Sequence, residues 1–151
     1  MEDKQRQVFQ FFNEVGIINQ LSTALFNRVL PDGVHASHFS VLNHFVRLGD
    51  GKTPLQLAEA FQVTKGTMTH TLATLSKRGF VRIAPHESDG RSKVVFITNE
   101  GRIFQRQAME ALLPVMQELG GKLDIDAMIA MLPGLASVRQ VLDENRDVGG
   151  S

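Results

Sequence analysis

Hydrophobic residues recur every three or four positions between Lys4 and Leu30, which is the spacing of an amphipathic helix. The recurring residues are Val8, Phe11, Phe12, Val15, Ile18, Leu21, Leu25 and Val29. Phe9, Ile17 and Phe26 widen this apolar surface beyond what one core face needs. We therefore expect the helix to pack against a second chain as well as its own. Burial within its own domain is the alternative, and periodicity does not separate the two.

Two shorter helices are predicted between residues 37 and 60, separated by Gly49-Asp50-Gly51. The second begins with Thr53, Pro54 and Gln56, the pattern of an N-cap with a capping box. Its inward positions are expected to be Leu55, Leu57 and Ala58. A three-residue turn, Phe61-Gln62-Val63, then leads into another helix. Two helices joined in this way form a helix-turn-helix.

The helix after this turn has one narrow apolar stripe, formed by Met68, Leu72 and Leu75. Thr64 suits its N-cap, and Gly79 suits a left-handed cap at its end. The opposite side is small, polar and free of acidic residues, and it carries Gly66, Thr67, His70, Ala73, Thr74 and Lys77. A helix in a major groove needs such a face, because small residues allow close approach and polar ones reach base edges and phosphates. A solvated face is the default alternative.

A β-hairpin is predicted directly after this helix. Two apolar runs, residues 80–83 and 94–97, flank a polar loop over residues 85–92. Gly90 is expected to adopt a positive φ at the tip, with Asp89 and Arg91 close enough to brace one another. An arginine held at a hairpin tip can enter a narrow minor groove, where the potential is most negative. The pattern is that of a recognition helix followed by a wing.

Two further helices are predicted after the hairpin. Thr98 caps one that extends to about Leu119 and is kinked at Pro114. The last covers residues 126–145 and is broken into two pieces at Pro133-Gly134, and residues 146–151 form a tail. We predict that the terminal helices of two copies pair, because they are too apolar to form a core alone. The predicted dimer interface includes Val8, Phe12, Val15, Leu132, Leu135, Val138 and Leu142.

Charge is distributed unevenly along the 151 residues, although the formal net charge is zero. Residues 64–93 hold six basic and two acidic side chains, a net charge of +4, and the remainder carries −4. This polarity favours nucleic-acid binding by the predicted helix and wing. The chain has no cysteine, which excludes disulfides, thiolate zinc sites and thiol redox switching. No signal peptide or membrane span is visible, so a cytoplasmic bacterial protein is expected.

The hairpin and its surroundings resemble the multiple-antibiotic-resistance regulator (MarR) family of winged-helix repressors. The matching segments are Asp89-Gly90-Arg91, Val94-Val95-Phe96-Ile97-Thr98 with Gly101, Leu55-Gln56-Leu57-Ala58, and Met68-Thr69 through Leu75 to Gly79-Phe80-Val81. The resemblance covers essentially the whole chain and implies a mainly α fold with a small β-hairpin wing. It implies one domain, residues 1–151, with a winged helix-turn-helix over 35–98 and dimerisation helices over 4–30 and 99–145.

The resemblance also implies a homodimeric repressor that binds an inverted-repeat operator in double-stranded DNA, with one recognition helix in each half-site. Transferred by position, base or phosphate contacts are implied for Lys65, Thr67, Thr69 and His70, and a minor-groove role for Arg91 braced by Asp89. The mechanism that follows takes phosphate contacts from Lys65, Lys77, Arg78 and Lys93. Gly66 and Thr74 complete the predicted DNA-binding set.

Many members of this family release DNA when a small aromatic or lipophilic effector binds. The sequence identifies no such effector and no cofactor. With ten phenylalanines and no Trp or Tyr, a pocket is expected to be apolar. The main alternative function is a winged helix that binds only other proteins. In that case removing Arg91 or Lys77 would change no DNA affinity.

Two chemical alternatives were weighed against DNA binding. His35 and His38, with Glu14 or Asp32, could bind zinc, although lone histidines are more often surface or hydrogen-bonded residues. His86, Ser88 and Asp89 have the residue types of a hydrolytic triad. They stand within four positions on one loop, so they cannot supply the converging supports that a triad requires. No enzyme activity is expected.

Overall fold

The computed structural model describes residues 2–150, which form six helices and one two-stranded antiparallel sheet. The chain divides into two compact units, residues 1–112 and 113–151, with the boundary inside the fifth helix. The elements in chain order are α1 (Asp3–Val29), α2 (Ala36–Leu48), α3 (Pro54–Phe61), α4 (Lys65–Lys77), β1 (Val81–Pro85), β2 (Lys93–Ile97), α5 (Asn99–Gly120) and α6 (Ile125–Glu144). The predicted fold class, mainly α with a hairpin, is confirmed.

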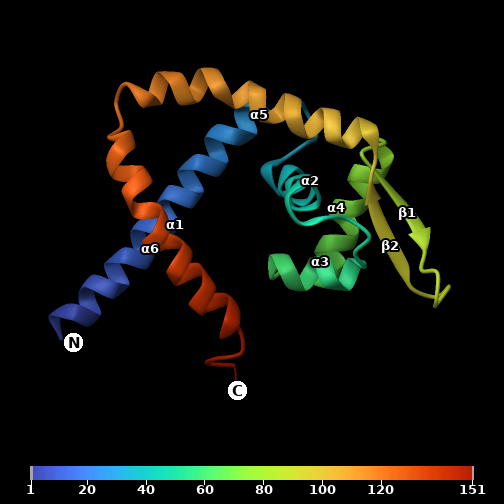
Figure 1. Cartoon of the computed structure of the whole chain (residues 1–151), viewed down its shortest axis with the longest axis horizontal. Helices are drawn as coiled ribbons and strands as arrows, with labels where there is room; N and C mark the ends of the chain where they lie inside the picture. The colour runs from blue at the N-terminus through green and yellow to red at the C-terminus, as the bar shows by residue number, and fades with distance from the viewer. Residues whose placement is uncertain (1, 151) are drawn as a thin grey trace. The chain divides into compact units, whose positions relative to one another are not determined.

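The core of the first unit lies where α2, α3 and α4 meet the hairpin (Figure 1). Leu42, Phe45, Leu57, Leu75 and Val95 are almost completely buried there. The apolar stripe predicted on α4 is confirmed, because all three of its members belong to this cluster. Of the three residues of α3 that were predicted to point inward, one prediction is wrong. Leu55 is 52% exposed, whereas Leu57 and Ala58, on the other face of the helix, are buried.

The helix-turn-helix begins and ends where the sequence predicted. The Thr53 side chain accepts the Gln56 N–H at 3.2 Å, and the Gln56 amide accepts the Thr53 N–H at 2.9 Å, so the capping box is complete. The turn after α3 has no glycine, and Gln62 adopts the left-handed conformation with φ of 52°. The Gln62 amide group donates to the Glu59 carbonyl at 2.8 Å, which helps to hold that conformation.

The hairpin pairs Val81 with Ile97 and Pro85 with Lys93. It has a third partner that the sequence did not reveal. Lys52 forms a bridge to Val95, with the Val95 N–H donating to the Lys52 carbonyl at 2.9 Å. Asp50 also accepts the Ile97 N–H at 3.0 Å. The segment predicted only to end α2 therefore ties that helix to the base of the wing.

A second, smaller cluster joins the end of α1 to α2 and α5 within the first unit. Leu30, Val34 and Ala108 are buried, and three phenylalanines pack against them. The rest of α1 contributes no buried residue. The predicted interface residues Val8, Phe12 and Val15 are 57%, 44% and 40% exposed in the single chain.

In the second unit, α6 is one continuous helix, so the predicted break at Pro133-Gly134 is wrong. Proline removes one backbone hydrogen bond but does not force the chain out of the helical region. No residue of α6 is buried. Of the predicted interface residues, Leu132, Leu135 and Leu142 are exposed, and Val138 is half-buried. Among the described helices only α6 is long and apolar enough to cross a membrane, which is weak evidence for a span.

Candidate nucleic-acid interface

The outward side of α4 is held in place by a strong N-terminal cap. The Thr64 hydroxyl accepts the Thr67 N–H at 3.1 Å, which satisfies one of the free donors of the first turn. Gly79 has a φ of 75° just beyond the helix, as its predicted capping role requires. The fixed ends leave Lys65, Gly66 and His70 on the exposed surface.

Threonine hydroxyls on α4 donate to carbonyls of their own helix. Thr69 donates to the Lys65 carbonyl at 2.8 Å, and Thr74 donates to the His70 carbonyl at 3.3 Å. Their oxygen lone pairs and methyl groups remain for a partner. A lone pair suits the amino group of adenine or cytosine, and a methyl group suits thymine. Thr69 is exposed and Thr74 is half-buried, so Thr69 presents more of its surface to a partner.

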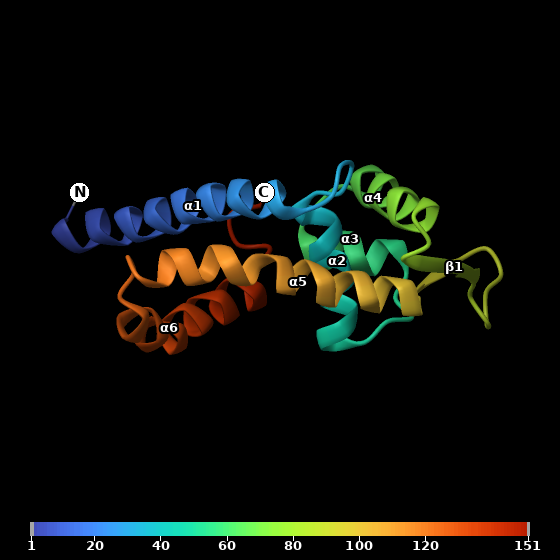
Figure 2. The ribbon, with the colours of Figure 1, turned by 90° about the horizontal axis from the view of Figure 1, so that it is seen from above.

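The wing projects away from α3 and α4 and ends in the loop between β1 and β2 (Figure 2). Two sequence expectations for this loop need correction. Gly90 is not among the residues with positive φ. The Asp89 carboxylate supports the loop by accepting the Arg91 N–H at 3.1 Å and the Ser92 hydroxyl at 3.4 Å, not by pairing with the Arg91 guanidinium. The Arg91 guanidinium has no partner within residues 2–150 and is free to reach outward.

The base of the wing carries a basic residue on an aromatic support. The Arg82 guanidinium carbon lies 4.7 Å from the centre of the Phe96 ring, a cation–π contact. Lys93 is exposed at the start of β2. In the sequence, Arg82 is one of the six basic residues of the 64–93 segment, with no further predicted role. Its register opposite Phe96 becomes apparent only when the strands are paired.

The two basic residues at the end of α4 differ in their surroundings. Lys77 is exposed and makes no hydrogen bond or ion pair with the residues that the structure describes. The Arg78 guanidinium instead donates to the backbone carbonyl of Asp32, in the turn between α1 and α2. Both were predicted to contact phosphates, and only Lys77 stands without an internal partner.

Histidines gather near this turn without forming a metal site. His38 is buried, and its Nδ1 accepts the His35 N–H at 2.9 Å, which leaves only Nε2 as a possible metal ligand. Burial lowers the pKa of His38 first, and the positive charges of His35, Arg78 and His70 lower it further. No cluster of three metal-ligating side chains occurs within residues 2–150.

The loop residues considered for a triad are also partly engaged with one another. His86 Nδ1 lies 2.9 Å from the Ser88 hydroxyl. The Asp89 carboxylate, however, is directed to Arg91 and Ser92 rather than to His86. A triad needs the carboxylate on the second imidazole nitrogen, so this geometry does not provide one.

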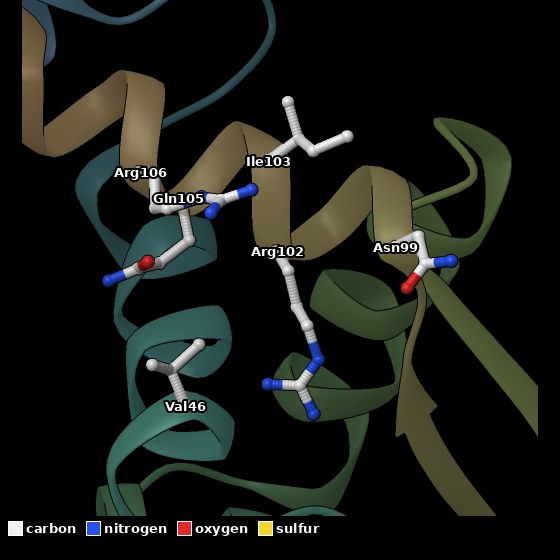
Figure 3. Close-up of a pocket in the computed structure, with 6 residues that line it drawn as sticks. All are labelled: Val46, Asn99, Arg102, Ile103, Gln105 and Arg106. Atoms are coloured by element: carbon white, nitrogen blue, oxygen red, sulfur yellow. The ribbon is translucent and has the colours of Figure 1, made fainter.

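An open groove of about 410 Å³ lies between α2 and α5. Val46 comes from α2, and the other lining residues, Asn99, Arg102, Ile103, Gln105 and Arg106, come from α5 (Figure 3). Gln105 is buried, and its amide group donates to Asn43 at 3.3 Å. The two arginines make this groove more polar than the apolar pocket expected from composition.

Comparison with known proteins is consistent with this geometry. Residues 32–92, which span the helix-turn-helix and most of the wing, match the MarR family. No curated protein sequence matches the chain. Wild-type MarR from E. coli is 27% identical, with a TM-score of 0.72 over 83% of this chain and 94% of that one.

Two further structures extend the likeness. A cysteine-to-serine mutant of E. coli MarR, complexed with operator DNA, is 25% identical with a TM-score of 0.71, covering 91% of this chain and 99% of that one. The regulator BldR from Sulfolobus solfataricus shares the fold at 24% identity, with a TM-score of 0.72 and the same coverage. These relatives support a DNA-binding regulator rather than an enzyme. Residues 32–92 therefore match the MarR family, and the chain shares the fold of MarR-family regulators over most of its length.

Proposed function

We propose that this protein is a homodimeric repressor that binds an inverted-repeat operator, with α4 in the major groove and the wing tip in the adjacent minor groove. The observation that carries the proposal is the acid-free outer face of α4, beside a wing whose terminal residue Arg91 has no partner among residues 2–150. Structures of this family include a complex with operator DNA.

Each part of this surface has a distinct task in the proposal. Thr67, Thr69 and His70 face base edges, where Gly66 permits close approach. Lys65, Lys77 and Lys93 contact phosphates, which fix the register of the helix but carry no sequence information. Arg91 enters the minor groove, where its charge responds to groove width. Thr74 adds a more sheltered contact, and Arg78 is considered separately below.

The second copy is supported by the exposed apolar surface of each unit. On α1 eight large apolar residues are at least 39% exposed: Val8, Phe9, Phe11, Phe12, Val15, Ile17, Ile18 and Leu21. Burying apolar area contributes about 25 cal/mol per Å², so covering these eight side chains with a second surface would favour association. A second copy of this chain is the occupant we propose, because a two-fold dimer offers two recognition helices to a palindrome.

The groove between α2 and α5 is the effector site in this proposal. The α2–α5 groove places Val46 and Ile103 beside two arginines that have no partner in the described part of the chain. We therefore expect an organic anion with an apolar body rather than a wholly apolar molecule. Naphthoate should bind more tightly than neutral naphthamide and should weaken operator binding. Equal binding of the two probes would remove this groove from the proposal.

The function is tested by fluorescence anisotropy with labelled promoter fragments at two salt concentrations. A subset of fragments should bind tightly and with strong salt dependence. Arg91→Ala should lower affinity for that subset by roughly tenfold or more. Lys4→Ala removes one positive charge at the exposed start of α1 and serves as the control that leaves binding unchanged. Weak, equal binding to every fragment by all three proteins would support a winged helix used for protein contacts instead.

A further inference from the structure

The end of the recognition helix is attached to the start of the winged-helix region through one side chain. The Arg78 guanidinium donates to the Asp32 carbonyl, which lies 46 positions earlier in the chain. Arg78 is the C-cap residue of α4, and Asp32 lies in the turn that connects α1 to α2. The contact therefore joins the end of α4 to the turn that follows α1.

The turn is shaped to receive this side chain. Gly33 has a φ of 80°, a conformation that side-chain-bearing residues rarely adopt. A Cβ atom at this position would stand only 2.8 Å from Nη2 of Arg78. The backbone angle therefore requires glycine here, and a methyl group would push the Arg78 guanidinium out of the space that it fills.

The turn that accepts Arg78 is itself well anchored. The Asn27 side chain accepts the Ala36 N–H at 2.7 Å, which links the last turn of α1 to the first turn of α2. Leu30 and Val34, on either side of the turn, are buried against Ala108. A carbonyl fixed in this way can position the arginine that donates to it.

A second contact acts on the same end of α4. Phe80 follows the helix by three residues, and its ring stacks on Phe104 of α5 with centroids 4.4 Å apart. The end of the recognition helix is thus held by the α1–α2 turn through Arg78 and by α5 through Phe80. These two attachments add to the core packing of Met68, Leu72 and Leu75 in holding the end of α4.

We infer that Arg78 is a positioning residue, which sets the direction of the recognition helix through Asp32 and Gly33 instead of binding a phosphate. Because both α1 and α5 hold this end, a change in how these helices pack would be transmitted to α4. The inference rests on the proposed DNA-binding function. It assigns a phosphate contact to Lys77 and a positioning role to Arg78, and a salt titration of DNA binding separates these two roles.

The test measures binding of the wild type, Arg78→Ala and Lys77→Ala to an operator and to an unrelated duplex over a range of salt. Each phosphate contact contributes about 0.9 to the slope of log affinity against log salt. Lys77→Ala should lower that slope on both DNAs. Arg78→Ala should weaken operator binding about tenfold while leaving affinity and slope on the unrelated duplex unchanged. A slope reduced on both DNAs, as for Lys77→Ala, would overturn the inference.

A double-mutant cycle tests the contact without DNA. Gly33→Ala is introduced into the wild type and into Arg78→Ala, and urea unfolding is followed by circular dichroism. The backbone strain of alanine is common to both backgrounds, but only the wild type also has the clash with the guanidinium. Gly33→Ala should therefore be more destabilising in the wild type, and equal effects would overturn the contact. If the wild type binds no fragment specifically, the proposed function fails while this cycle still decides the contact.

Discussion

Replacing Gly101 with alanine should separate the wing from α5. Gly101 lies in the first turn of α5, and a Cβ there would stand 2.1 Å from the Phe80 carbonyl oxygen and 2.9 Å from a side-chain carbon of Ile97. The nearest obstacle is backbone, which cannot rotate away as a side chain can. The two segments must move apart for the methyl group to fit.

The size of the effect follows from the contacts at this junction. The Thr98 N–H donates to the Phe80 carbonyl at 3.1 Å, and the Phe80 ring stacks on Phe104. Losing the hydrogen bond costs about 1 kcal/mol, and weakening the ring pair costs about 0.5–1.5 kcal/mol. Overpacking adds about 1–3 kcal/mol, and the better helix propensity of alanine offsets up to about 1 kcal/mol. Together these terms predict that Gly101→Ala lowers the unfolding free energy by about 2–5 kcal/mol.

Thermal unfolding at fixed protein concentration is the appropriate assay, because dimerisation would make the midpoint concentration-dependent. The chain has no Trp or Tyr, so the helical circular dichroism signal replaces intrinsic fluorescence. A fall of about 4–20 °C in the unfolding midpoint is expected, at about 2–4 °C per kcal/mol for a chain of this length. Gly66→Ala is the matched control, because nothing lies within 4 Å of the added Cβ in α4. If Gly101→Ala were as stable as this control, the steric reasoning would be refuted.

Three further predictions follow from the same structure. Gly66→Ala should raise the unfolding free energy by up to about 1 kcal/mol yet weaken operator binding in an anisotropy titration, because the methyl group holds α4 away from the groove; unchanged binding would contradict a close approach. The pKa of His38 is lowered by burial and by neighbouring positive charges, from an ordinary value of 6.5. The unfolded chain therefore binds the proton more tightly, and stability is full above pH 6.5 and falls as the pH decreases below it. His38→Asn keeps an acceptor for the His35 N–H. In urea unfolding it should lose less stability than the wild type between about pH 7.5 and 5.5. The loss that remains in the variant is expected from His44, whose pKa is also lowered, chiefly by burial; an equal loss in both proteins would exclude His38 as the source. Phe12→Glu should convert the dimer to monomer in sedimentation experiments, while Ser88→Glu, which adds the same charge in the wing, should not; a dimeric Phe12→Glu would place the interface elsewhere.

The sequence alone determined the features that depend on local interactions. The capping box at Thr53 involves residues three positions apart, and the buried stripe of α4 follows from helical spacing. The hairpin was located correctly because apolar strands and a polar loop alternate within eighteen residues, Phe80 to Ile97. The resemblance of the wing to the MarR family rested on the same short segments. Gly101, part of that resemblance, acquires a physical reason only from the nearby Phe80 carbonyl.

Tertiary structure decided the features in which competing local preferences were nearly balanced. Leu55 is apolar yet exposed, because α3 turns the face that carries Leu57 and Ala58 toward the core. Gln62 adopts a left-handed conformation that glycine adopts more easily. Helix α6 continues through Pro133, where the sequence predicted a break. Each choice costs on the order of 1–3 kcal/mol locally, which is small enough for packing and hydrogen bonds elsewhere to outweigh.

The candidate site shows the same division. Sequence placed Lys65, Thr69, His70 and Arg91 on an exposed helix and wing, because their exposure follows from the buried stripe opposite and from a polar loop. It could not distinguish Lys77 from Arg78, which are adjacent and equally basic. Their difference depends on a carbonyl 46 residues away. Partners so distant in sequence are brought together only when the whole core forms, since local spacing carries no information about them.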